Sequence, residues 1–292
     1  MTNGARLRVA IAIVAVFVLV EVVGAVLSGS LALLADSGHM FSDLLGLVIA
    51  LVALGIAARP ATDRQTFGYQ RAEVFGALAN GLILAVVSLY IAVEGVRRLF
   101  EPSAVDARLM LIVAAAGLVA NIAVMLVLRG SARESIGMRG VYLEVLGDLL
   151  GSFAALVAGF VILGTGFDRA DAIASLVIAA LIVPRALSLL RDVFRVLSQG
   201  VPKNMDVAQI REHLLQTAGV VDVHDVHVWA ITSGAPVFSA HVVCSKQLFE
   251  SGGTSALLDE LGACLAGHFD VEHSTFQLEP EDHAAQEGQL HR

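Results

Sequence analysis

The amino-acid sequence predicts an α-helical membrane protein with a small α+β domain at its C-terminal end. Of its 292 residues, 57% are hydrophobic and only 16% are charged, which is far more apolar than a soluble domain of this length. The charge also changes along the chain, because the first 200 residues carry 15 Lys or Arg and 14 Asp or Glu, whereas the last 92 carry 4 and 13. We therefore divide the chain into a membrane domain at 1–200, an α+β domain at 201–282 and a disordered end at 283–292.

Six apolar segments are long enough to cross a bilayer, which takes roughly 20 residues. They lie at about 8–28, 31–58, 73–99, 108–129, 140–163 and 172–196. The first follows basic residues, but it is too long for a signal peptide and no small-residue cleavage site follows it. It is therefore predicted to be a retained helix.

The distribution of Lys and Arg near the helix ends predicts the orientation. Eleven basic residues lie on the side that holds the N-terminus and the last 92 residues, against Arg97, Arg98, Arg108 and Arg169 on the other. Under the positive-inside rule, both termini are expected to face the cytoplasm. The expected location is the inner, or plasma, membrane of the cell.

The last 92 residues show the periodicities of a small mixed domain. Helical patterns cover about 206–217 and 255–268, and strand patterns cover about 221–231, 236–245 and 272–280. The two cysteines, Cys244 and Cys264, lie here without CxxC spacing, so reduced thiols are expected.

Ionisable residues repeat inside the second and fifth predicted spans. Asp36, His39 and Asp43 share one helix face, and the pattern His39-x-x-x-Asp43-Leu-Leu-Gly matches Glu144-x-x-x-Asp148-Leu-Leu-Gly. Each such group costs about 2.5–3.5 kcal/mol at bilayer depth, so it faces a cavity or a partner. Two matching pairs on two helices predict one four-coordinate site.

A divalent cation is the expected partner of these side chains, since no Lys or Arg is expected at the centre of a span. One imidazole and three carboxylates suit tetrahedral Zn²⁺, while oxygen-rich ligation also suits Mn²⁺ or Fe²⁺. The alternative is a set of hydrogen bonds between helices. Asp36 has two alternative interpretations: it orients His39 or relays protons, or it caps the helix. The other polar residues of the spans are more readily interpreted as structural, and they are Glu21, Asn80, Glu94 and Asn121.

The stretches LLADSGHMFSD, FGYQRAEVFGALANG, YLEVLGDLLGS and VHDVHVWAITSG resemble the cation diffusion facilitator family, most of all its bacterial zinc exporters. The resemblance covers about residues 8–280. It implies six membrane helices, a cytosolic ferredoxin-like domain, a homodimer, and export of Zn²⁺ from the cytosol in exchange for protons.

Carried over by motif, the resemblance implies a transport site at His39, Asp43, Glu144 and Asp148, where Glu144 departs from the His of many zinc exporters. It also implies a regulatory metal site at His224, His241 and Glu279, with surface histidines as the alternative. Strand alternation allows only one of His224 and His227 to join His241. The loops after the second and fourth spans lack the His residues with which some relatives bind or collect metal.

The expected mechanism is alternating access, with metal binding coupled to loss of protons from the ligands. A metal sensor with a membrane anchor would have no need for carboxylates inside the membrane. A membrane metalloenzyme would need an HExxH pair or a similar set, and the sequence has none, so no enzymatic activity is expected.

Overall fold

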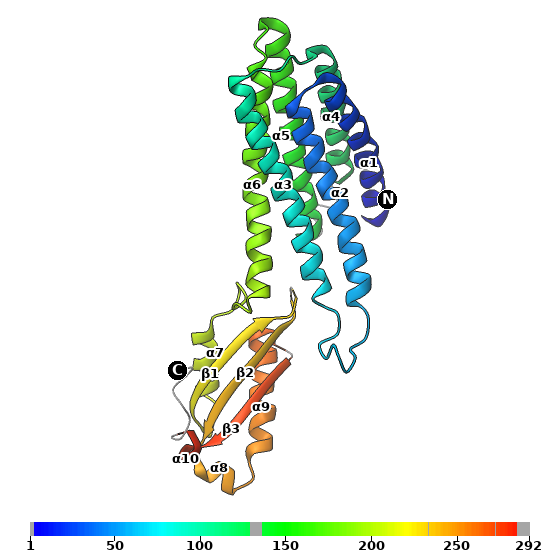
Figure 1. The fold of residues 1–292 in the computed structure, drawn as a ribbon. Coiled ribbons are helices and arrows are strands. Elements are labelled where there is room, and N and C mark those ends of the chain that lie inside the picture. The colour runs from blue at the N-terminus through cyan, green and yellow to red at the C-terminus, as the bar shows by residue number, and fades with distance from the viewer. Residues whose placement is uncertain (1–2, 129–135, 233, 272, 285–292) are drawn as a thin grey trace. The chain divides into compact units, whose positions relative to one another are not determined.

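The structure is a computed structural model that describes residues 3–128, 136–232, 234–271 and 273–284, the side chains of residues 3–11, 47, 127–128, 136–144 and 284 excepted. It divides into two units, one of residues 1–51 and 76–190 and one of residues 52–75 and 191–292. Six long helices, drawn from blue to yellow-green in Figure 1, carry the apolar segments of the sequence. They are α1 (Asn3–Ser28), α2 (Leu31–Ala57), α3 (Ala72–Phe100), α4 (Ala107–Leu128), α5 (Ile136–Thr165) and α6 (Arg169–Leu197).

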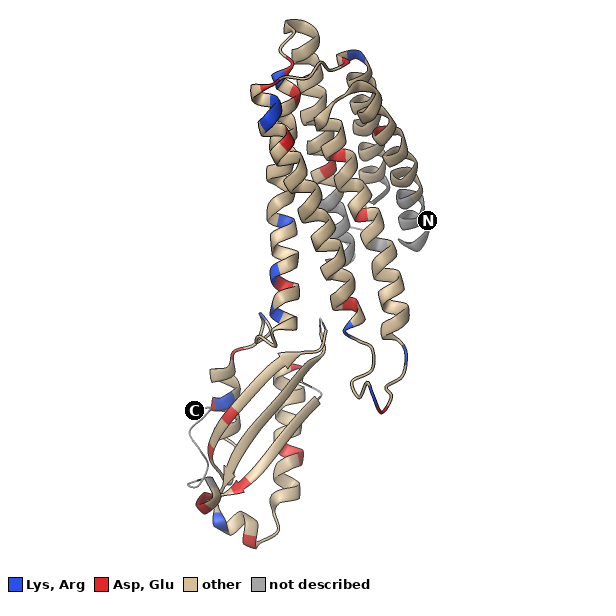
Figure 2. Ribbon diagram, in the orientation of Figure 1, with Lys and Arg blue, Asp and Glu red and all other residues tan. Residues whose placement is uncertain are grey.

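The helical membrane architecture predicted from the sequence is confirmed. Among the described residues, α2 to α6 are each long and apolar enough to cross a membrane, and α1 contributes the apolar stretch Ala12–Ser28. Large apolar side chains cover the outside of the bundle, for instance Leu19, Leu51 and Phe100, which are 69%, 72% and 79% exposed. Figure 2 shows few charged positions along the middle of the helices. Such a surface suits lipid rather than water.

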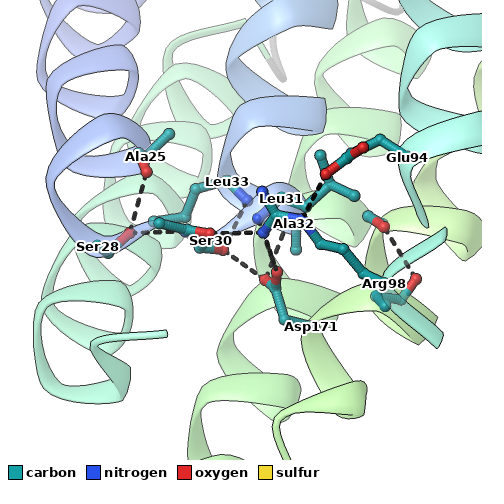
Figure 3. A network of polar contacts seen from close by, with 12 residues as sticks. Ala25, Ser28, Ser30, Leu31, Ala32, Leu33, Glu94, Arg98 and Asp171 are labelled. Carbon is teal, nitrogen blue, oxygen red and sulfur yellow. Dashed lines mark hydrogen bonds and ion pairs between the residues drawn. The ribbon is translucent and has the colours of Figure 1, made fainter. Parts of the chain in front are cut away.

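The N-terminus of α2 is held by side chains from two other helices (Figure 3). The Ser30 hydroxyl accepts a hydrogen bond from the Leu33 amide at 3.1 Å, and Asp171 of α6 accepts from the amides of Leu31 and Ala32 at 2.7 and 3.1 Å. Arg98 of α3 donates to the Gly29 carbonyl at 2.7 Å. The amides that an α-helix leaves unpaired in its first turn are thereby satisfied inside the bundle.

The C-terminal domain is a three-stranded sheet with helices on one face. Its elements are α7 (Val207–Leu215), β1 (Val220–Ala230), β2 (Pro236–Cys244), α8 (Lys246–Glu250), α9 (Thr254–Phe269), β3 (His273–Pro280) and α10 (Glu281–Ala284). Strand β2 is central, antiparallel to β1 and parallel to β3. Apolar residues of α7, α9 and the sheet form its core, with Phe238 and Leu261 fully buried. The α+β prediction is confirmed, with the two short helices α8 and α10 not foreseen and residues 285–292 of the expected disordered end outside the described residues.

A β-bulge interrupts the alternation of β1. His224 pairs with His241, and the next pair is His227 with Ser239. Between these two pairs, β1 advances by three residues and β2 by two. Asp225 adopts a left-handed backbone with φ of 50° inside this bulge. Asp is among the residues that tolerate this region, and bulges often redirect side chains next to functional sites.

Candidate metal centre

Three of the four predicted membrane ligands converge in the helical unit. His39 and Asp43 lie one turn apart on α2, and Asp148 reaches them from α5. The His39 Nε2 atom is 3.6 Å from Asp43 Oδ2 and 3.6 Å from Asp148 Oδ1. His39 and Asp148 are only 5% and 6% exposed, so the cluster lies inside the bundle.

These distances suit ligands of one metal ion better than hydrogen bonds. A nitrogen and an oxygen separated by 3.6 Å are too far apart for a strong hydrogen bond. Two ligands of a tetrahedral zinc, each 2.0–2.2 Å from the metal, lie roughly 3.3–3.6 Å apart. One atom from each of the three side chains falls within 4.8 Å of the other two. The separations between His39 and the two carboxylates therefore agree with the spacing of ligands around one metal ion.

The fourth predicted ligand, Glu144, belongs to α5, but its side chain lies outside the described residues. The glycines beside it on α5 let other side chains come close. A Cβ atom at Gly151 would lie 2.4 Å from Asp36 Oδ1, and one at Gly147 would lie 3.7 Å from Arg185 Nη1. The first contact leaves no room for a side chain, so Gly151 permits α2 and α5 to meet.

Arg185 of α6 corrects the expectation that no basic residue reaches this part of the membrane. Its Nη1 atom donates a hydrogen bond to His39 Nε2 at 3.0 Å. Arg185 itself is exposed, while Ala186 beside it and Ile182 one turn before it are 1% and 2% exposed. The sequence held this signal, because the residue falls close to the midpoint of the segment predicted at 172–196.

Asp36 does not cap α2, since Ser30 has that role, and the capping interpretation was wrong. Asp36 is 1% exposed and accepts a hydrogen bond from the Ser152 hydroxyl of α5 at 2.9 Å. Asn121 of α4 donates to the same Ser152 oxygen at 3.2 Å. A buried polar chain thus links α4, α5 and α2 one turn from His39.

The second predicted cluster forms on the sheet face opposite the helices of the C-terminal domain. His224 and His241 are direct partners across β1 and β2, with ring centroids 5.2 Å apart. Glu279 of β3 is 1% exposed, and its two oxygens lie 2.7 Å from His241 Nδ1 and 3.4 Å from His224 Nε2. His227 lies outside the group of potential ligands, in agreement with the expectation that only one of the two β1 histidines joins His241.

Two neighbouring side chains that were not among the predicted ligands lie against this cluster. Gln277 donates to Glu279 Oε1 at 2.8 Å, and Asp225 in the bulge places Oδ2 3.7 Å from His241 Nε2. When Nδ1 of His241 carries the proton and donates it to Glu279, Nε2 of His241 has the lone pair that can bind a metal. A carboxylate commonly orients a metal-binding imidazole in this way. Strict strand alternation gave no hint of Asp225.

Models of two protein domains match the chain in succession. The "cation efflux transmembrane domain" matches residues 7–198, and the "cation efflux protein, cytoplasmic domain" matches residues 202–281. The chain belongs to the cation efflux family. It is therefore a membrane transporter of divalent metal cations and not an enzyme, and the resemblance seen in the sequence is confirmed.

Curated relatives of this cation efflux protein match over nearly its whole length. The metal cation efflux system protein CzcD of Cupriavidus metallidurans is 38% identical over 95% of this chain and 87% of its own. The zinc transporter ZitB of Escherichia coli is 39% identical over 95% and 88%. A cadmium, cobalt and zinc/H(+)-K(+) antiporter of Bacillus subtilis is 36% identical over 91% and 86%.

Among solved structures, the metal-bound C-terminal domain of the CzcD transporter is 37% identical, with a TM-score of 0.24. It covers 26% of this chain and 99% of its own.

Proposed function

We propose that this transporter exports Zn²⁺ from the cytosol in exchange for protons, through a site formed by His39, Asp43, Glu144 and Asp148. The observation that carries the proposal is the buried convergence of His39, Asp43 and Asp148 at 3.6 Å separations. One imidazole and acidic oxygens at these separations fit a tetrahedral zinc. The names of the relatives agree, since one is a zinc transporter and another an antiporter of zinc, cadmium and cobalt with protons and potassium.

The ligand chemistry supports the exchange with protons. A metal ligand must be deprotonated, so binding releases protons from the His and carboxylate groups, and their return favours release of the ion. Imidazole has an unperturbed pKa of about 6.5, closest among the ligands to physiological pH. Alternating access of this site to the two sides of the membrane then couples the two flows.

The distribution of basic residues supports an orientation in the inner membrane with both termini in the cytoplasm. In that orientation the ion enters from the side that holds the C-terminal domain. The ion then leaves the cell with each cycle.

The C-terminal domain is proposed to bind a second, regulatory zinc ion at His224, His241 and Glu279 in a homodimer. The described ligand atoms lie within 4.8 Å of one another, and Glu279 is a buried carboxylate that faces two histidines. A buried charge of this kind is costly unless it is paired or binds a metal.

Flux into proteoliposomes with an imposed pH gradient tests the transport proposal. Zn²⁺, Cd²⁺, Co²⁺, Mn²⁺ and Fe²⁺ are compared for wild type, Asp43→Asn and Asp148→Asn, with Asp259→Asn at an exposed position of α9 as the matched control. We expect gradient-driven zinc flux in wild type and the control, and its loss in both site variants. Wild-type flux in Asp148→Asn would refute the proposed site. Zinc flux that does not depend on the pH gradient would refute the exchange with protons.

A further inference from the structure

The contact between Arg185 and His39 has a chemical consequence for the transported ion. A guanidinium has five N–H donors and no acceptor, so the 3.0 Å contact requires His39 Nε2 to offer its lone pair. A ring nitrogen has a single lone pair in the ring plane. The same Nε2 atom faces Asp43 and Asp148 at 3.6 Å and is therefore the ligand atom of the proposed transport site.

A metal ion and Arg185 consequently compete for one lone pair. We propose that Arg185 is an internal cation that occupies the transport site in competition with the transported ion, so that it weakens ion binding and speeds ion release. The inference rests on the proposed transport site and adds a specificity-determining residue to it. Arg185 touches a ligand of the ion through its own N–H and is displaced when the ion binds.

The permanent charge of the side chain distinguishes this competitor from a proton. Arginine stays protonated at every physiological pH, so Arg185 does not leave the site by titration. It leaves by movement of a long, flexible side chain, for which Gly147 provides space, since even an added Cβ there would lie 3.7 Å from Nη1.

A count of charges gives a reason for the presence of Arg185 in this chain. The four proposed ligands include three carboxylates, and a divalent cation together with one guanidinium balances their three negative charges. With His at position 144, as in many zinc exporters, two carboxylates and the divalent cation would balance without an arginine. The count uses only the residue types, and it couples Arg185 to the unusual Glu144.

The test is the separate measurement of KM and kcat for zinc flux in proteoliposomes. Arg185→Met removes the charge and the donor but keeps an unbranched apolar side chain. We expect KM to fall roughly ten- to a hundredfold, the equivalent of one charge-assisted hydrogen bond, and kcat to fall because release slows. Arg185→Lys restores a charged donor and should return both constants toward wild type. Arg191→Met makes the same substitution at an exposed position of the same helix and should change neither.

The outcomes separate this inference from the transport site itself. An increase in KM in Arg185→Met would mean that Arg185 only positions His39, and an unchanged KM would mean that the contact has no role; either overturns the inference while the site stands. If Arg185→Met does not yield monodisperse protein, Arg185→Leu, which also lacks a charge and a donor, serves as the second variant with the same expectation. Wild-type flux in Asp148→Asn would instead refute the transport site.

Discussion

Among the four proposed ligands, Glu144 is the one whose replacement we expect to change the preference for ions most directly. A carboxylate in place of an imidazole favours harder cations such as Mn²⁺, so Glu144→His should raise the ratio of zinc flux to manganese flux. The same change removes one of the three negative charges of the proposed ligand set, so KM for every ion should rise. The measurement is the set of KM values in proteoliposomes for Zn²⁺ and Mn²⁺. An unchanged flux ratio would show that Glu144 is not a ligand.

The charge balance also predicts that the effects of Glu144 and Arg185 on KM are opposite in sign and compensate in the double variant. In Glu144→His/Arg185→Met, the two remaining carboxylates again match one divalent cation, so KM for zinc should return toward the wild-type value. A double-mutant cycle of KM values measures this compensation and any coupling between the two residues. A KM in the double variant that stays as far above that of wild type as in Glu144→His would contradict the balance.

The two thiols should differ in reactivity. Burial raises the pKa of the Cys244 thiol, which is 0% exposed. The pKa of the partly exposed Cys264 thiol is also raised, mainly by burial and to a smaller extent by the negative charge of Glu260. A raised pKa leaves less thiolate at neutral pH, so both react slowly, and Cys244 is also inaccessible in the folded domain. We expect maleimide to label Cys264 at least roughly tenfold faster than Cys244 at pH 7. Mass spectrometry of Cys264→Ser, in which Cys244 alone can react, is the check.

At the scale of helices, the contacts of Asp171 tie α6 to the N-terminus of α2. Asp171 is 1% exposed and also accepts a hydrogen bond from the Ser30 hydroxyl at 2.5 Å. Asp171→Ala should lower the free energy of unfolding by about 2–4 kcal/mol, because three donors lose a charged acceptor inside the bundle. Thermal unfolding of the purified protein measures the effect. Asp171→Asn should fall between Asp171→Ala and wild type, while Asp63→Ala in an exposed loop should match wild type.

The elements were more predictable than their irregularities. The segment predicted at 172–196 is α6, Arg169–Leu197, because an apolar run of membrane length is a strong signal. The strand predicted at about 221–231 is β1, Val220–Ala230, because alternation marks a half-buried strand. The bulge at Asp225 breaks that alternation through one left-handed residue, which no period reveals.

The candidate site was predictable to the extent that its residues repeat in sequence. The matched motifs of α2 and α5 predicted that His39 and Asp148 meet, and the structure brings them to 3.6 Å. The role of Arg185 depends on a contact between residues 146 positions apart, which sequence periodicity does not encode.

At the scale of the molecule, the chain holds two clusters of potential metal ligands in different chemical settings. One lies inside an apolar bundle and includes Arg185 as a competing cation. The other lies on a sheet face of a domain with a polar surface, where Glu279 orients His241 through Nδ1. With Arg185 as a competing cation, the first cluster is proposed to hold its ion briefly and release it.

The two clusters predict the number of ions bound by the whole protein. Purified wild-type chain, dialysed against buffered zinc and analysed by inductively coupled plasma mass spectrometry, should hold two ions per chain. Asp148→Asn should remove the ion of the membrane site, and His241→Ala should remove that of the C-terminal domain, because each loses a ligand that its neighbours cannot replace. Arg185→Met should keep two ions and retain the membrane ion at lower free zinc. If His241→Ala still holds two ions, the histidines of the sheet do not bind metal. If wild type holds only one ion and His241→Ala holds none, stable binding is confined to the C-terminal domain.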